Sequence, residues 1–158
     1  GLGTPQWDYG ARGMLGGLTR GSERAHIVRA VLEGVAHRGA DLVAAAEADT
    51  SLTIPTLRVD GGMSANPTFV EALADATAKP VEVSPIVDAT TLGAGFLAGA
   101  ATGVWSDVAT AAGSWSPRVV VDPTDRAAPD GDTLTRDRWH EAVRRAGGWI
   151  PDLSALDF

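Results

Sequence analysis

The residues best suited to bind a ligand are a pair of glycines that follow a short apolar run. Gly61 and Gly62 come directly after Val59 and Asp60, and Asn66 opens a predicted helix shortly afterwards. Glycine has no Cβ, so a charged or flat ligand can approach its backbone closely. The first turn of a helix adds unpaired N–H groups and the positive end of the helix dipole. Together these features predict a platform for a phosphate or a sugar hydroxyl.

The same residues also have an interpretation that needs no ligand. Gly61 and Gly62 can serve a tight turn that requires positive φ, and Asn66 can act only as a helix cap. Asp60 could meet a metal or a hydroxyl, but hydrogen bonds to the amides of the turn are the favoured interpretation. Taken alone, the glycine pair favours a purely structural turn.

No catalytic or metal-binding constellation is evident elsewhere in the sequence. His26, His37 and His140 have no carboxylate or histidine at a convincing metal-binding spacing, so surface or packing roles are expected. The sequence has no Walker-type loop, no serine with a plausible base and no acid–base pair of carboxylates. We therefore predict no catalytic residue and no metal ligand in this chain.

Length and composition indicate one soluble domain. The chain has 158 residues, of which 44% are hydrophobic and 21% charged, values typical of a globular protein. A formal charge of −7 disfavours binding to nucleic acid or to an anionic membrane, and no apolar run is long enough to cross a bilayer. The sequence has no cysteine and no signal-like start, which predicts a cytoplasmic protein.

The elements that must position the glycine pair alternate along the chain. A long helix is predicted from Ser22, its cap, to about Asp49, and a strand at 55–59 leads into the glycines. The next elements are a helix capped by Asn66, a strand at 81–83 and a helix at 90–102. Apolar residues recur at near-helical spacing along the first helix: Ile27, Val31, Val35, Leu42 and Ala46.

This alternation predicts parallel strands joined by helical crossovers, and hence the α/β class. No period is visible over about 106–135, where we predict an irregular excursion or a linker. A last amphipathic helix is expected over 136–146, with Trp139, Ala142 and Val143 on one side.

Several blocks of the sequence resemble the glycerol kinases and their relatives among the carbohydrate kinases. The resemblance covers almost the whole chain and is weakest over 106–135. It implies a partial ribonuclease-H-like (actin-like ATPase) domain, in which residues 1–158 form the C-terminal portion of the second, nucleotide-side domain. The matching blocks lie at 1–8, 11–21, 24–34, 58–66, 91–94, 97–99, 103–105 and 139–146.

The resemblance implies a transferase that moves the γ-phosphate of ATP to glycerol and gives glycerol 3-phosphate. In the family, the second glycine and the asparagine contact ATP or ADP, which here implies nucleotide binding by Gly62 and Asn66, flanked by Gly61. The catalytic aspartate, the Mg ligands and the glycerol pocket would lie in a preceding portion that this chain lacks. The chain alone is therefore expected to be inactive.

Two alternatives to a glycerol kinase stay open. The substrate could be another sugar or polyol, such as xylulose, because the residues that distinguish these substrates lie outside the chain. The chain could also be a non-catalytic nucleotide-binding or structural module. The resemblance further allows a homo-oligomer of the full-length enzyme, for which the sequence defines no interface.

Overall fold

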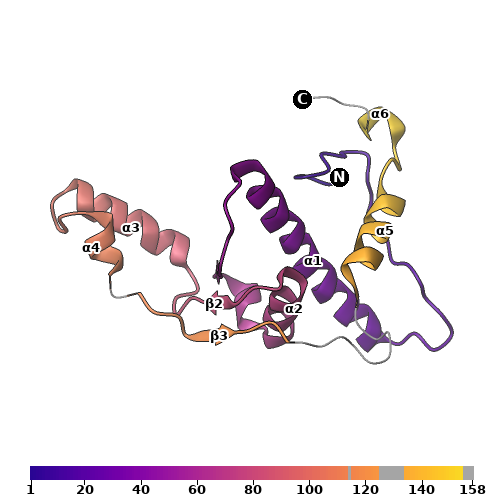
Figure 1. Ribbon diagram of the computed structural model, residues 1–158, viewed down its shortest axis with the longest axis horizontal. Helices are drawn as coiled ribbons and strands as arrows, with labels where there is room; N and C mark the ends of the chain where they lie inside the picture. The colour runs from indigo at the N-terminus through magenta and orange to yellow at the C-terminus, as the bar shows by residue number, and fades with distance from the viewer. Residues whose placement is uncertain (114, 125–133, 155–158) are drawn as a thin grey trace.

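The computed structural model describes residues 1–113, 115–124 and 134–154 and shows an α/β arrangement around a small sheet (Figure 1). The strands are β1 (Leu57–Val59), β2 (Val81–Val83) and β3 (Val119–Val121), in the order β1-β2-β3. β1 and β2 are parallel, as predicted, with Leu57 opposite Val81, whereas β3 runs antiparallel to β2. β1 therefore forms one edge of the described sheet.

Helices connect and flank these strands. The predicted long helix, the helix after Asn66, the helix near 90–102 and the last amphipathic helix are all confirmed within one or two residues. The described helices are α1 (Arg24–Thr50), the 3-10 turn η1 (Gly62–Ala65), α2 (Pro67–Thr77), α3 (Ala89–Ala101), α4 (Val108–Ala112), α5 (Arg136–Ala146) and α6 (Pro151–Ser154).

The start of α1 differs from the prediction by one residue. Glu23 is the cap, and its N–H donates to Nδ1 of His26 at 3.0 Å. The predicted cap, Ser22, instead accepts a hydrogen bond at its Oγ from the N–H of Thr19 at 2.9 Å. The hydroxyl of Ser22 is thus used by the preceding turn, and the capping role passes to the next residue.

The core lies where α1 and α2 pack against each other and against β2. Its buried members are mostly small or β-branched: Ala36, Val70, Leu73, Ala74, Val81 and Val83. A Cβ on Gly39 would lie only 2.9 Å from Cδ1 of Leu73. The glycine therefore permits the close approach of the two helices.

Most of the predicted apolar positions of α1 do not join this core. The side chains of Val31, Val35 and Leu42 are 52%, 46% and 46% exposed. The buried residues of α1 are Ala36, His37, Ala40 and Asp41, which lie on a different face of the helix. The helix therefore buries a small and polar face and leaves Val31, Val35 and Leu42 about half exposed.

The region 106–135 is more regular than predicted. It contains α4 and β3, so the prediction of an irregular excursion was wrong for 108–112 and 119–121; residues 125–133 lie outside the described part of the chain. Asp107 caps α4 by accepting a hydrogen bond from the N–H of Thr110, and β3 is an unbroken run of three valines. Neither a five-residue helix nor a three-residue strand is long enough to show a hydrophobic period.

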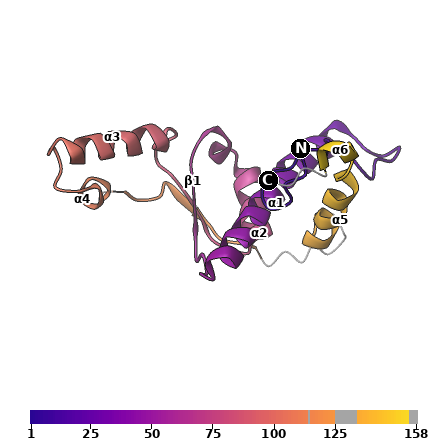
Figure 2. The ribbon, with the colours of Figure 1, turned by 90° about the horizontal axis from the view of Figure 1, so that it is seen from above.

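The α3–α4 pair lies apart from the other helices. Figure 2 shows β1 between this pair and the α1–α2 pair. A Cβ on Gly99 would lie 2.2 Å from the ring of Trp105, so the glycine admits the indole that packs beside α3. Among the described helices, none is long and apolar enough to cross a membrane.

The two ends of the described chain lie together. The Asp8 carboxylate accepts hydrogen bonds from the N–H groups of Gly10 and Ala11, both at 2.9 Å, and from that of Gly148 at 2.7 Å. The hydroxyl of Ser154 also donates to Asp8. One carboxylate thus joins the segment that precedes α1 to the segment that follows α5 (Figure 1).

Candidate functional site

The glycine pair forms a fixed turn at the C-terminal end of β1. Gly61 has φ +82°, a conformation that side chains strongly disfavour. Its N–H donates to the carbonyl of Val87 at 3.0 Å, and its carbonyl accepts from the N–H and the hydroxyl of Ser64 at 3.2 and 2.7 Å. The turn is therefore held on both sides and requires glycine at its first position.

The outer face of this turn is open. A Cβ built on Gly61 or on Gly62 would meet no atom within 4 Å. Gly62 is exposed, and its φ lies outside the range that disfavours a side chain. The backbone of Gly62 therefore does not need glycine for packing or conformation, and the free space leaves room for a ligand.

Asn66 caps α2 directly behind the turn, as predicted. Its Oδ1 accepts a hydrogen bond from the N–H of Phe69 at 3.4 Å, and Pro67 occupies the first helical position. The backbone N–H of Asn66 donates to the carbonyl of Met63 at 3.0 Å, whereas its side-chain Nδ2 makes no hydrogen bond within the described residues and is available as a donor. The cap thus leaves the ligand-binding role of Asn66 open.

Asp60 does not take the role that we favoured for it. Its side chain is exposed and forms no hydrogen bond with the amides of the turn in the described structure. The contacts of Gly61 with Val87 and Ser64 hold the turn instead. Among residues 1–113, 115–124 and 134–154, no group of three or more histidine or acidic side chains is placed to hold a metal ion.

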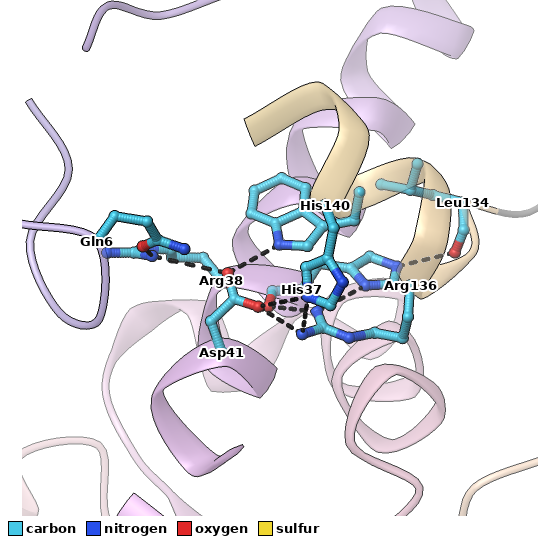
Figure 3. Close-up of polar contacts among 8 residues, drawn as sticks. Gln6, His37, Arg38, Asp41, Leu134, Arg136 and His140 are labelled. Carbon is cyan, nitrogen blue, oxygen red and sulfur yellow. Dashed lines mark hydrogen bonds and ion pairs between the residues drawn. The ribbon is translucent and has the colours of Figure 1, made fainter. Parts of the chain in front are cut away.

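A second polar cluster, which sequence reasoning missed, joins α1 to α5 (Figure 3). Asp41 has a side chain that is only 3% exposed and that forms an ion pair with Arg136. It also accepts a hydrogen bond from Nε1 of Trp139 at 2.8 Å, and Nε2 of His140 lies 3.5 Å away. On the α1 side, the guanidinium of Arg38 approaches Asp41 to 3.6 Å.

His37 completes this α1–α5 cluster. Its Nε2 lies 2.8 Å from the carbonyl of Leu134, and its ring stacks on Trp139 with centroids 5.8 Å apart. If Nε2 carries the proton and donates to Leu134, Nδ1 is left to accept from Arg136, 3.2 Å away. Burial lowers the pKa of His37, and the nearby charge of Arg136 adds to this effect.

The charge state of Asp41 follows from the same contacts. Burial alone would raise the pKa of this carboxyl, but the hydrogen bonds from Trp139 and Arg136 outweigh burial and hold the pKa below its ordinary value. Asp41 is therefore ionised and fully engaged at neutral pH. The cluster fastens α5 to α1, which agrees with the packing role expected for His37 and His140.

The fold and the turn together define an α/β domain whose candidate ligand site is the carboxyl end of a parallel strand, beside a helix N-terminus. Residues 1–102 match the model of the FGGY family of carbohydrate kinases, C-terminal domain. The chain therefore belongs to the FGGY family of carbohydrate kinases, which confirms the resemblance and the predicted fold class.

Individual relatives agree with this assignment. The chain is 43% identical over 150 residues to a glycerol kinase of Aromatoleum aromaticum, a match that covers 95% of this chain and 30% of the relative. It superimposes on a Plasmodium falciparum glycerol kinase solved with ADP, with a TM-score of 0.74, 28% identity and coverage of 100% of this chain and 30% of the other. A xyloylose kinase from Brucella ovis is also 28% identical, with a TM-score of 0.62 over 89% of this chain and 27% of the other. The chain thus spans about three tenths of the length of its relatives.

Proposed function

We propose that this chain is the nucleotide-binding portion of a cytoplasmic glycerol kinase, from the C-terminal part of the second domain. In the complete enzyme, the γ-phosphate of ATP is transferred to a terminal hydroxyl of glycerol. The observation that carries the proposal is the open glycine turn at the end of β1, in a chain 43% identical to a glycerol kinase.

Three residues of the turn would bind the nucleotide. Gly61 shapes the turn, Gly62 offers backbone that a flat ligand can approach, and Asn66 provides an amide donor at the start of α2. The free space beside Gly62 fits such a ligand. Nucleotide binding accounts for glycine at position 62, which a purely structural turn does not need.

The remaining parts of the reaction are assigned to the portion of the enzyme outside this chain. The described residues offer no metal cluster, so the Mg²⁺ that accompanies ATP would be held by the phosphates and by side chains elsewhere. The catalytic base and the glycerol pocket belong to the same missing portion. Phosphoryl transfer depends on positioning both substrates, so the chain alone should bind nucleotide weakly and turn over no glycerol.

An ADP titration of the ¹⁵N-labelled chain, followed by amide chemical shifts, tests the site. We expect the largest shifts at Gly61, Gly62 and Asn66, and a loss of binding in Gly62→Val, because the new side chain would occupy the open space. Gly13→Val is the matched control, since a Cβ at Gly13 also meets no atom within 4 Å. Equal binding by Gly62→Val and Gly13→Val would contradict the assignment.

The substrate is tested separately from the nucleotide site. The similarity to the Brucella ovis kinase keeps xylulose as the second candidate. The chain joined to the preceding portion of the enzyme should phosphorylate glycerol in preference to xylulose in a coupled ADP-release assay. A preference for xylulose would move the assignment to another kinase of the family, and no activity with either substrate would favour a binding module.

A further inference from the structure

Ser64, two positions after the glycine pair, has a buried hydroxyl group that contacts the turn. The residue is 7% exposed, and its Oγ donates to the carbonyl of Gly61 at 2.7 Å. The backbone N–H of Ser64 donates to the same carbonyl at 3.2 Å. This backbone hydrogen bond already closes the turn, so closure alone does not require a hydroxyl at position 64.

The hydroxyl makes the better of the two contacts with this carbonyl. A distance of 2.7 Å is close to the optimum for an O–H donor, whereas 3.2 Å is at the long end of the range for an N–H donor. Oγ of Ser64 therefore contributes most to the direction in which the carbonyl of Gly61 points. That direction is inwards, towards a buried side chain.

The direction of the Gly61 carbonyl determines the direction of the next N–H. The peptide bond between Gly61 and Gly62 is planar and trans, so the carbonyl of Gly61 and the N–H of Gly62 point in opposite directions. With the carbonyl held by Ser64, the N–H of Gly62 points away from Ser64. Among the described residues this N–H has no acceptor, and Gly62 is exposed. The N–H of Gly62 is therefore free to donate to a ligand.

Other contacts fix the turn on either side of this peptide. The N–H of Gly61 donates to the carbonyl of Val87 at 3.0 Å, which holds the preceding peptide in place. The carbonyl of Ser64 accepts a hydrogen bond from Nη2 of Arg118, just before β3, at 3.4 Å. The side chain of Ser64 therefore acts on the peptide that joins the two glycines.

We propose that Ser64 is a positioning residue for the nucleotide, whose hydroxyl directs the N–H of Gly62 towards an acceptor atom of bound ADP or ATP. This role rests on the proposed function, which assigns the nucleotide to the turn. A donor that is already aligned loses less freedom when the ligand binds, so the complex is more stable. Ser64 is buried and acts through the peptide of the two glycines rather than by touching the nucleotide.

A purely structural hydroxyl is the alternative, and Thr77 provides a comparison for it. Oγ1 of Thr77 donates to the carbonyl of Leu73, also at 2.7 Å, and this contact is likewise partly buried. Thr77 is the last residue of α2, at the opposite end of the helix from its cap Asn66. Removing either hydroxyl deletes a hydrogen bond of the same length, but only Ser64 lies beside the glycine turn. The two variants therefore separate positioning from stability.

An ADP titration of the ¹⁵N-labelled chain, followed by amide chemical shifts, compares the wild type with Ser64→Ala and Thr77→Val. We expect ADP binding to weaken about three- to tenfold in Ser64→Ala, the effect of one lost hydrogen bond, and less than about twofold in Thr77→Val. In the free chain, the amide resonance of Gly62 should move in Ser64→Ala and stay in place in Thr77→Val. Ser64→Cys keeps a small side chain that donates only weakly, so it should resemble Ser64→Ala.

The outcomes distinguish this role from the proposed function. If the wild type binds ADP and Ser64→Ala binds it as tightly as Thr77→Val, the proposal is overturned and the function stands. Wild-type affinity in Ser64→Cys would show that packing matters rather than the hydrogen bond, and would also overturn the proposal. No ADP-induced shift in the wild-type chain would refute the function, and the positioning role would fall with it.

Discussion

Replacing Asp41 with asparagine tests how α5 is held on α1. The change keeps the shape of the side chain and removes the charge that Arg136 faces. Asparagine can still accept one hydrogen bond, but its NH₂ group must then point at another donor, either Trp139 or Arg136. One charge-assisted contact is therefore lost and one donor is left facing a donor.

The expected cost follows from the burial of this carboxylate. A hydrogen bond to a charged group contributes about 1.5 to 3 kcal/mol, and breaking a buried ion pair costs about 3 to 5 kcal/mol. Arg136 is 30% exposed, so water recovers part of that loss. We expect the free energy of opening α5 to fall by about 2 to 3 kcal/mol, which corresponds to a rise of about 30- to 150-fold in the exchange rates of its amides.

Amide hydrogen exchange at pH 7 measures this effect directly. Glu141→Gln is the control, because the ion pairs of Glu141 among the described residues are with the exposed Arg144 and Arg145 of its own helix, and such pairs contribute about 0.3 to 0.5 kcal/mol. The pKa of Asp41 is lowered in the folded chain, so its contribution is present above the ordinary value of 3.8 and is lost as the pH falls through the folded value. A change of less than threefold in Asp41→Asn would refute the reasoning.

Three other predictions concern single residues. Burial lowers the pKa of His37, so the folded chain should lose stability as the pH falls below the ordinary histidine value of 6.5, and His37→Gln should flatten that slope in urea titrations at pH 7.5 and 5. Gly61→Ala forces a side chain into positive φ and should cost about 1 to 3 kcal/mol, whereas Gly62→Ala should cost under about 0.5 kcal/mol; equal costs by urea unfolding would contradict the described turn. Gly99→Val should displace the indole of Trp105, seen as a red shift of tryptophan fluorescence, while Gly93→Val, with open space around its Cβ, should not.

Local rules were enough to predict the strand, the turn and the helix start around the candidate site. A strand, two glycines, and an Asn-Pro helix start each carry their signal within a few residues, and the structure places them as expected. The same rules failed to predict contacts between residues that are far apart in the sequence. Asp41 and Arg136 lie far apart in the sequence, and no local sequence pattern near either residue predicts that the two are in contact.

The short strand β3 and the exposed aliphatic face of α1 were not predicted from the sequence, for other reasons. β3 is three valines long and two of them are exposed, so it shows no alternation. The apolar spacing of α1 predicted a helix correctly, but spacing cannot say whether the partner of that face lies in the same polypeptide segment. The structure shows that among the described residues it does not.

The hydrogen bonds of the Asp8 carboxylate affect how the two ends of the chain unfold. It accepts hydrogen bonds from the N–H of Gly10, two positions away, and from that of Gly148, 140 positions away. Opening either end breaks the contacts of Asp8 with Gly148 and Ser154 that join the two, so the ends should behave as one cooperative unit in partial unfolding. A protease that cuts near one end would loosen the opposite end at the same time, although the two are separated by nearly the whole chain.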